Sequence, residues 1–322
     1  MNELRIKVVG LGGFGLSTVE EISYKYAGLT YLGLSNKIDD INKSPLRDKI
    51  LLGNGVTTNH SPELGKRRIQ ESMDEIKKSL ENNDVVILIT ALGYGTGSGG
   101  APIISKLAKD LGSYVISICT TPFSFEGQNR DSNAKSALAE LKKSSDSLIV
   151  ISNQKLIKGI VKPSNGVEEK IEEARNLVRH IVISIDNVIN SSSSFNEFKK
   201  INELSKETYF GVGAVMGEEN ALVALRLAAK PNIIDKSLSN ANKVLVSINY
   251  KTEVSENTLN LIYDELYNII GRDVEIIYTH TMDELSSGIL MLSLFASGDG
   301  KAETVLSEFD KLKDAINPNN LM

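Results

Sequence analysis

The stretch Ala91-Leu-Gly-Tyr-Gly-Thr-Gly-Ser-Gly-Gly-Ala-Pro102 follows the most apolar run of the chain, Asp84–Thr90, and opens a segment with a helical pattern. Its glycines expose backbone N–H groups without side-chain obstruction, which is typical of an anion-binding loop at a helix amino terminus. Thr96 and Ser98 add hydroxyl donors, and Pro102 suits the first turn of the helix. A flexible linker would instead be surrounded by polar residues. No Gly-Lys-Ser/Thr follows, so this phosphate site is not a Walker loop.

A second glycine-rich segment, Gly10-Leu-Gly-Gly-Phe-Gly15, lies between a strand-like run and a helical pattern. Its GxGxxG spacing lets the backbone turn tightly and approach a phosphate. A dinucleotide site would need an acidic residue about 20 residues further on, to hold the ribose. Ser35-Asn36 stands there instead. A nicotinamide oxidoreductase is therefore a disfavoured alternative.

Apolar runs alternate with helical patterns through the first half of the chain. The predicted strands are Arg5–Val9, Thr30–Leu34, Asp84–Thr90, Ser113–Cys119 and Ser147–Ile151. The predicted helices between them are Ser17–Tyr26, Leu64–Leu80, Gly100–Leu111 and Asp131–Lys143. Continuous apolar strands separated by helices indicate an α/β fold with a doubly wound parallel sheet, whose ligand binds at the carboxyl ends of the strands.

A long amphipathic helix is predicted over Val167–Asn190, about 35 Å long at 1.5 Å per residue, and ended by the serine run Ser191–Ser194. Its apolar stripe comprises Ile171, Ala174, Val178, Ile181, Ile185 and Val188. The last third predicts strands at Tyr209–Met216, Lys243–Tyr250, Val274–Thr279 and Gly288–Ala296, and helices at Glu218–Ala229, Glu256–Ile270 and Thr304–Leu312. We therefore expect a nucleotide-binding domain (1–166), a central helix (167–190), a smaller α+β domain (191–316) and a short tail (317–322).

Composition narrows the class of protein. The net charge of −5 and the pI near 5.5, with no block of basic residues, argue against nucleic-acid binding. Cys119, the single cysteine, lies in an apolar run and is expected to be a reduced core residue. The three histidines, His60, His180 and His280, have no metal-ligand spacing, so no protein metal site is expected. The sequence shows neither a signal peptide nor a membrane span, and we expect a cytoplasmic protein without direct membrane insertion.

Five segments in order resemble the tubulin/FtsZ family, over about residues 5–298. Gly93–Gly99 resembles the family's Gly-Gly-Gly-Thr-Gly-Ser/Thr-Gly loop, with Tyr94 in place of a glycine. The other four are Ile6–Gly15, similar to the FtsZ amino-terminal strand and first phosphate loop; Thr121–Arg130, similar to Lys-Pro-Phe-Asn-Phe-Glu-Gly-Lys-Lys-Arg; Asp146–Leu156, similar to the strand that ends in Asn-Asp-Lys-Leu; and Gly211–Glu219, similar to the start of the activation domain.

The resemblance implies a site for GTP or GDP with Mg²⁺. The residues that it assigns to the phosphate loops and their surroundings are Gly12, Gly13, Phe14, Ser17, Gly93, Tyr94, Gly95, Thr96, Gly97, Ser98 and Gly99. It further implies that Glu126 holds the ribose, that Arg130 lies near the phosphates and that Asn153 contacts the base. From the residues alone, Glu126 and Arg130 could instead form a surface ion pair four residues apart.

Two departures from the family bear on function. Where the family has an aromatic that stacks on guanine and an aspartate that reads its edge, this chain has Ile171 and Asn176. An amide both accepts and donates, so the choice between guanine and adenine stays open. In the loop that the family inserts into the next subunit's site, Glu197 and Lys200 replace the two catalytic aspartates. A lysine cannot accept the proton of the attacking water, though its charge could stabilise a phosphate.

The resemblance implies two functions. The first is a self-assembling GTPase, which binds itself head to tail in a filament and completes hydrolysis between subunits through Glu197 and Lys200. The second is a non-hydrolysing FtsZ-like protein in which nucleotide has a structural or regulatory role, and which could co-assemble with a second FtsZ-like protein. The sequence lacks the long linker and tail peptide by which cell-division FtsZ proteins recruit membrane adaptors. A specialised relative, chromosomal or carried on a phage or plasmid, is therefore as well supported as a division-ring protein.

Overall fold

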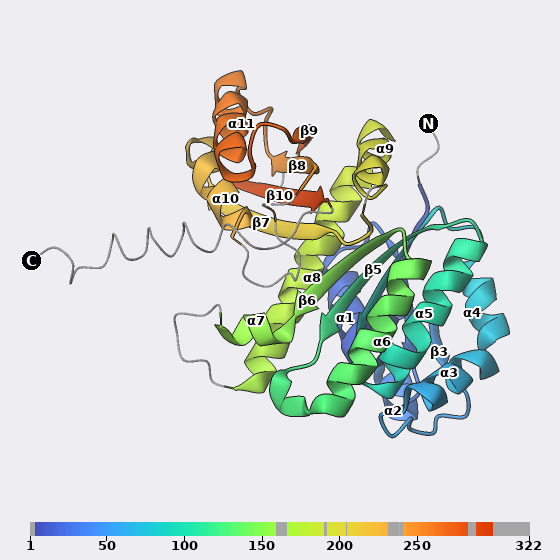
Figure 1. Cartoon of the computed structure of the whole chain (residues 1–322). Helices are drawn as coiled ribbons and strands as arrows, with labels where there is room; N and C mark the ends of the chain where they lie inside the picture. Colours follow the sequence, from blue (N-terminus) through green and yellow to red (C-terminus); the bar gives the residue numbers. More distant parts are fainter. Residues whose placement is uncertain are drawn as a thin grey trace, which may run out of the picture.

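The computed structural model describes residues 4–158, 166–189, 192–203, 205–230, 238, 241–282 and 288–298. The predicted helix at Thr304–Leu312 and the predicted tail 317–322 lie outside these ranges. Two sheets are present in the described part of the chain, and Figure 1 shows the long helix α8 (Val167–Ile189) running between them.

The first sheet is parallel throughout, with strand order β3-β2-β1-β4-β5-β6. Its strands are β1 (Ile6–Leu11), β2 (Thr30–Ser35), β3 (Lys49–Leu51), β4 (Val85–Ala91), β5 (Tyr114–Thr121) and β6 (Ser147–Ser152). This arrangement confirms the predicted doubly wound α/β fold and the predicted strands. Strand β3 was not predicted, because three residues at a sheet edge leave no readable periodicity.

Helices cover both faces of this sheet (Figure 1). One face is covered by α3 (Pro62–Glu71), α4 (Met73–Leu80), α5 (Gly95–Asp110) and α6 (Gln128–Ser144), and the other by α1 (Gly12–Lys25) and α8. Two short helices, α2 (Ile38–Lys43) and α7 (Asn153–Lys158), follow β2 and β6. Cys119 is buried in the core, as predicted.

The single helix predicted over Leu64–Leu80 is wrong, since α3 and α4 are separate helices on either side of Ser72. The Ser72 hydroxyl accepts a hydrogen bond from the Gly53 N–H at 2.9 Å and lies 3.4 Å from the Leu51 carbonyl. A serine that bonds to the backbone of another segment competes with helix continuation. The break therefore depends on a tertiary contact.

The apolar stripe of α8 joins the cores of the two sheets. Val178, Ile181, Ile185 and Val188 are fully buried in one cluster, together with residues from both sheets. The second sheet has the order β7-β10-β8-β9, in which only β8 and β9 pair in parallel. Its elements are β7 (Tyr209–Met216), η2 (Glu218–Asn220), α10 (Ala221–Ala228), β8 (Lys243–Tyr250), α11 (Glu256–Ile270), β9 (Glu275–Met282) and β10 (Ile289–Ser297).

The segment that holds Glu197 and Lys200, expected to be a loop, is the helix α9 (Ser192–Ile201). Phe195, Phe198 and Ile201 recur at three-residue intervals and are buried. The rings of Phe195 and Phe198 contact the Tyr114 ring, with centroids 5.6 and 6.3 Å apart. These contacts hold α9 at the amino end of β5, because Tyr114 is the first residue of that strand.

The segment after α9 returns to the first sheet before it enters β7. Leu148 of β6 forms a parallel bridge with Glu207. Its N–H donates to the Lys206 carbonyl at 2.6 Å, and its carbonyl accepts from the Thr208 N–H at 2.9 Å. The second sheet is therefore attached to the first by this backbone pairing as well as by α8.

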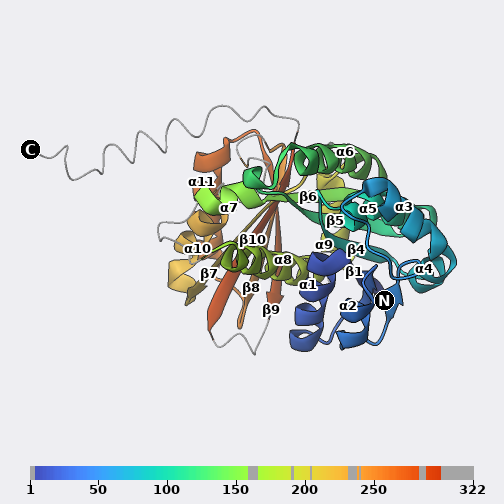
Figure 2. The ribbon, with the colours of Figure 1, turned by 90° about the horizontal axis from the view of Figure 1, so that it is seen from below.

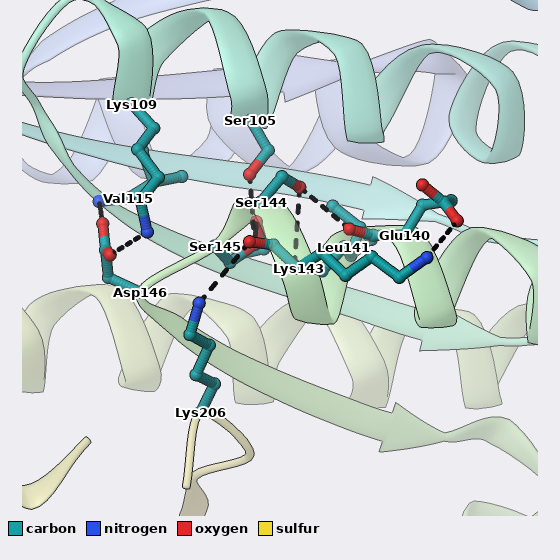
Figure 3. A network of polar contacts seen from close by, with 11 residues as sticks. Ser105, Lys109, Val115, Glu140, Leu141, Lys143, Ser144, Ser145, Asp146 and Lys206 are labelled. Carbon is teal, nitrogen blue, oxygen red and sulfur yellow. Dashed lines mark hydrogen bonds and ion pairs between the residues drawn. The ribbon is translucent and has the colours of Figure 1, made fainter. Parts of the chain in front are cut away.

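A polar network surrounds this attachment (Figure 3). The Lys206 ammonium lies 3.5 Å from the Lys143 carbonyl, close to the ion pair between Lys109 and Asp146. Asp146 also accepts from the Val115 N–H at 2.9 Å. Burial and the positive charge of Lys109 lower the pKa of Lys206, while Asp146 opposes that shift. Asp146 thus joins α5, β5 and the start of β6 beside the attachment.

Candidate nucleotide-binding site

Two helix amino termini meet at the carboxyl ends of the neighbouring strands β1 and β4. Helix α1 begins at Gly12, directly after β1, and α5 begins at Gly95, shortly after β4. The turns use left-handed backbone at Gly12 (φ 74°) and Gly93 (φ 99°), which favours glycine. A β-carbon on Gly12 would lie 3.8 Å from the Thr96 β-carbon, so the two termini adjoin. Free N–H groups and two helix dipoles converge here, which favours an anion.

Helix α5 begins earlier than predicted, at Gly95 instead of Gly100. The N–H of Ser98 already donates to the Tyr94 carbonyl at 3.0 Å. The unpaired N–H groups of the first turn are therefore those that precede Ser98, and Gly99 lies inside the helix. Pro102 is also inside the helix and not in its first turn, contrary to the prediction. Its missing N–H leaves the Ser98 carbonyl without that intrahelical partner.

The glycines of α5 are needed for packing. A β-carbon on Gly95 would lie 2.6 Å from the Ser61 carbonyl oxygen, and one on Gly99 would lie 2.0 Å from that of Pro62. On Gly97 it would lie 2.0 Å from the Ala91 carbonyl oxygen. These glycines therefore let α5 pack on α3 and on the end of β4. Gly13 differs: it is exposed, and its β-carbon would meet no atom within 4 Å.

We expect Gly97→Ala to destabilise the fold. Its β-carbon would push against backbone, which cannot rotate away, and such overpacking costs about 1–3 kcal/mol. Urea unfolding would measure the loss, with Gly13→Ala as the control whose free energy of unfolding stays nearly unchanged. Equal stability of Gly97→Ala and the unaltered protein would contradict this packing role.

Asn36, which sequence reasoning noted only as the place of a missing acid, supports the glycine loop. It is buried, and its Oδ1 accepts a hydrogen bond from the Thr96 hydroxyl at 2.7 Å. Its Nδ2 donates to the Val56 carbonyl at 3.3 Å. The sequence did hold a signal for this role. Asn36 is a polar residue directly after a buried strand, at the edge of the sheet where ligands of such folds bind.

Glu126 and Arg130 do form the ion pair that spacing allowed, but they form it against the glycine loop. The Tyr94 hydroxyl donates to Glu126 Oε2 at 2.7 Å, and Arg130 Nη1 contacts both that carboxylate and the Tyr94 oxygen. The Phe123 N–H donates to Glu126 Oε1 at 2.9 Å. Burial would raise the pKa of Glu126, but hydrogen bonds from Tyr94, Phe123 and Arg130 outweigh it and hold the pKa below its usual value. Glu126 is therefore an anchored carboxylate.

The residues assigned to the base lie on α7 and α8. Asn153 follows β6 directly, and its Oδ1 is buried with no hydrogen-bond partner among the described residues, as suits a ligand-binding acceptor. Asn176 and Ile171 are half-buried on α8. The neighbouring Arg175 pairs with Glu21 of α1 at 3.5 Å, so this part of α8 lies beside α1, as Figure 2 also shows.

Phe14 and Ser17 lie in the first turns of α1. Phe14 packs against the hydrophobic core on the α8 side of the sheet. The Ser17 hydroxyl donates to the Gly13 carbonyl at 2.8 Å, which leaves its oxygen free to accept. Both residues therefore border the α1 terminus, and neither side chain provides a free donor for a phosphate.

Glu197 and Lys200 lie away from all of these residues, at the other end of the first sheet. They pair with each other on α9, with 2.8 Å between the Lys200 ammonium and Glu197 Oε1. Hydrogen bonding to Glu197, together with its negative charge, raises the pKa of Lys200. The structure thus groups the glycine loops with Glu126 and Arg130, and separates the two catalytic candidates from them.

Within the described ranges, no group of three or more His, Cys, Asp or Glu side chains is placed to hold a metal ion. Mg²⁺ that accompanies a nucleotide is bound largely by phosphate oxygens and water, so the site is compatible with it. None of the described helices is long and apolar enough to cross a membrane.

Comparison with known proteins agrees with this architecture. The model of the Tubulin/FtsZ family GTPase domain matches residues 5–161. The cell division protein FtsZ of Mycoplasmopsis pulmonis is 30% identical over 319 residues, which cover 97% of this chain and 81% of that protein. Among solved structures, an empty FtsZ dimer from M. jannaschii has a TM-score of 0.82 at 24% identity, covering 92% of this chain and 89% of that one. A GTPγS-bound protofilament of CetZ2 from Haloferax volcanii has a TM-score of 0.78 at 17% identity. The match covers 98% of this chain and 100% of the CetZ2 chain.

The parallel sheet with two glycine-rich helix termini, joined through a long helix to a second mixed sheet, defines the class of GTP-binding cytoskeletal proteins. This chain belongs to the tubulin/FtsZ family. Members of this family are GTPases that bind GTP and GDP.

Proposed function

We propose that this protein binds GTP, with Mg²⁺, and assembles head to tail into filaments in which each contact completes a GTP hydrolysis site. The phosphates bind at the adjoining termini of α1 and α5, with Arg130 beside them. Glu126 takes the ribose, and Asn153 and Asn176 take the base. GTP and Mg²⁺ are available in the cytoplasm, which is the compartment that we propose.

The main support for head-to-tail assembly is the separation of Glu197 from the glycine loops. The loops lie at the carboxyl ends of β1 and β4, whereas α9 packs on the first residue of β5, at the amino end of the same sheet. One subunit therefore cannot bring Glu197 to its own phosphates without unfolding. Two subunits stacked in the same orientation bring the α9 end of one against the loop end of the other. Such a contact does not close and gives an open filament.

In this contact Glu197 acts as the general base for the attacking water, and Lys200 offers positive charge to the phosphates. Phosphoryl transfer depends mainly on positioning and electrostatic stabilisation, so a site completed only by assembly links turnover to polymerisation. Glu197 must first leave its ion pair with Lys200. This step costs little, because ion pairs between exposed side chains contribute little to stability.

The Glu197–Lys200 pair also supports the second candidate, a non-hydrolysing family member that binds nucleotide as a structural ligand. A carboxylate that stays paired with the lysine would not accept a proton from water. Such a protein could co-assemble with a second, catalytically competent FtsZ-like partner. Filaments that form with GTP but release no phosphate would identify this function.

The preference for guanine over adenine tests the assignment of GTP as the ligand. We expect the unaltered protein to bind GTP more tightly than ATP, but by a smaller margin than Asn176→Asp, since a carboxylate accepts two hydrogen bonds from guanine and an amide cannot. Isothermal titration with GTP and ATP, on both proteins, measures the two margins. Asn176→Ala serves as the control, with the smallest margin of the three. ATP binding equal to or tighter than GTP binding in the unaltered protein would overturn the assignment.

A further inference from the structure

Tyr94 lies where three segments around the glycine loop meet. Its hydroxyl donates to Glu126, and it accepts from Arg130 Nη1, both at 2.7 Å. On the other side its ring contacts the His60 ring, with centroids 5.4 Å apart. Tyr94 therefore connects the segment before α3, the η1 turn (Ser124–Glu126) and α6.

Arg130 is held by Tyr94 in two ways. Its guanidinium carbon lies 4.2 Å from the centroid of the Tyr94 ring, and its Nη1 bonds to the Tyr94 oxygen and to Glu126. Stacking and hydrogen bonding together fix a long cationic side chain that would otherwise be mobile. The arginine side chain is 26% exposed, so its outer face stays accessible to a ligand. Its conformational entropy is thus lost before a ligand arrives, which favours binding.

The Tyr94 residue is 38% exposed, but its hydroxyl already donates to Glu126 and accepts from Arg130. Burial and the hydrogen bond to Glu126 raise its pKa to about 12, so the phenol is neutral and protonated at physiological pH. Its proton is already donated to Glu126 and is not free for a phosphate. In the tubulin/FtsZ loop that Gly93–Gly99 resembles, a glycine stands in place of Tyr94. A glycine has neither a ring nor a hydroxyl. The contacts that fix Arg130 against the glycine loop therefore depend on the Tyr94 side chain.

We propose that Tyr94 is a positioning residue of the nucleotide site, which fixes Arg130 for the phosphate chain and acts through Arg130 instead of touching the nucleotide. This rests on the proposed binding of GTP and adds a determinant of its phosphate recognition. Because Arg130 acts on phosphate charge, the contribution of Tyr94 grows with the number of phosphates. It is largest for GTP, smaller for GDP and smallest for guanosine, which Tyr94 affects only through its bond to Glu126, the proposed ribose residue.

The test compares the unaltered protein with Tyr94→Phe, which keeps the ring over Arg130 but removes the hydroxyl, and with Tyr94→Gly, which removes both. Titration calorimetry with GTP, GDP and guanosine gives the affinities. Tyr94→Phe is expected to weaken GTP binding about fivefold, the effect of one net hydrogen bond, with a smaller loss for GDP and the smallest loss for guanosine. Tyr94→Gly is expected to weaken GTP binding further. Circular dichroism and thermal unfolding confirm that both variants fold.

A second experiment places Tyr94→Phe in an Arg130→Gln background, where its effect on GTP affinity should fall to the small effect that it has on guanosine affinity. Equal losses for all three ligands would show a structural role, and an undiminished effect on GTP affinity without Arg130 would show direct contact. Unchanged or tighter GTP binding by Tyr94→Phe would equally overturn the proposal. Failure of the proposed function itself is distinguishable, since the unaltered protein would then not bind GTP.

Discussion

Gly13→Asp is expected to abolish nucleotide binding while the protein stays folded. Gly13 is exposed in the first turn of α1, and a β-carbon there would meet no protein atom within 4 Å. A carboxylate in the first turn suits the helix dipole, so the fold tolerates it. The same carboxylate would occupy the anion position and repel phosphates. Like charges in contact cost several kcal/mol, so we expect GTP affinity to fall by about 100-fold or more.

Gly13→Ala is the matched control, because its methyl group enters the same open space without charge. Its GTP affinity should stay within about threefold of the unaltered protein, a change of less than 1 kcal/mol. Titration calorimetry measures both variants, and their unfolding curves should coincide with that of the unaltered protein. Normal GTP binding by a folded Gly13→Asp would show that the phosphates bind elsewhere.

Glu197→Ala is expected to lower GTP turnover by about 10²-fold or more, the usual contribution of a general base, while nucleotide binding and filament formation persist. The reason is that Glu197 reaches the phosphates only from the next subunit. Turnover per subunit in the unaltered protein should therefore rise with protein concentration. Phosphate release, measured across a concentration series beside light scattering for assembly, gives both quantities.

Glu203→Ala is a suitable control, since it removes an exposed carboxylate just after α9 and should leave turnover unchanged. Lys200→Asp separates two roles of the lysine. Faster turnover would show that the lysine hinders the base, and slower turnover that its charge stabilises the phosphates. Turnover that neither depends on concentration nor falls in Glu197→Ala would exclude hydrolysis between subunits.

The sequence predicted the elements whose signal is local. The strands of the first sheet other than β3 are largely apolar, and α8 and α11 carry an apolar stripe that repeats over several turns. The starts of α1 and α5 were placed too late, because glycine has a poor helix propensity and the first turn of each helix is glycine-rich. In both helices packing overrides propensity.

The candidate site was predicted as a set of residues but not as an arrangement. The phosphate loops and the Glu126–Arg130 spacing were readable from the sequence. The packing role of Gly97 was not, because it depends on how closely β4 approaches α5. The helical state of α9 was also missed. The family resemblance implies a loop there, and α9 begins at Ser192, within the serine run that was expected only to end α8. Phe195 and Phe198 form that helix by packing on distant aromatic rings.

The pairing of Leu148 with the segment before β7 has a mechanical consequence. Because the second sheet is attached both through α8 and through β6, it cannot swing about a single hinge. Strand β6 begins at this attachment and ends just before Asn153, about 20 Å away at 3.3 Å per residue. Strand β6 therefore connects the α9 end of the subunit to the nucleotide end. A displacement of residues 206–208 would therefore act directly on the strand that ends before Asn153, the residue assigned to the base.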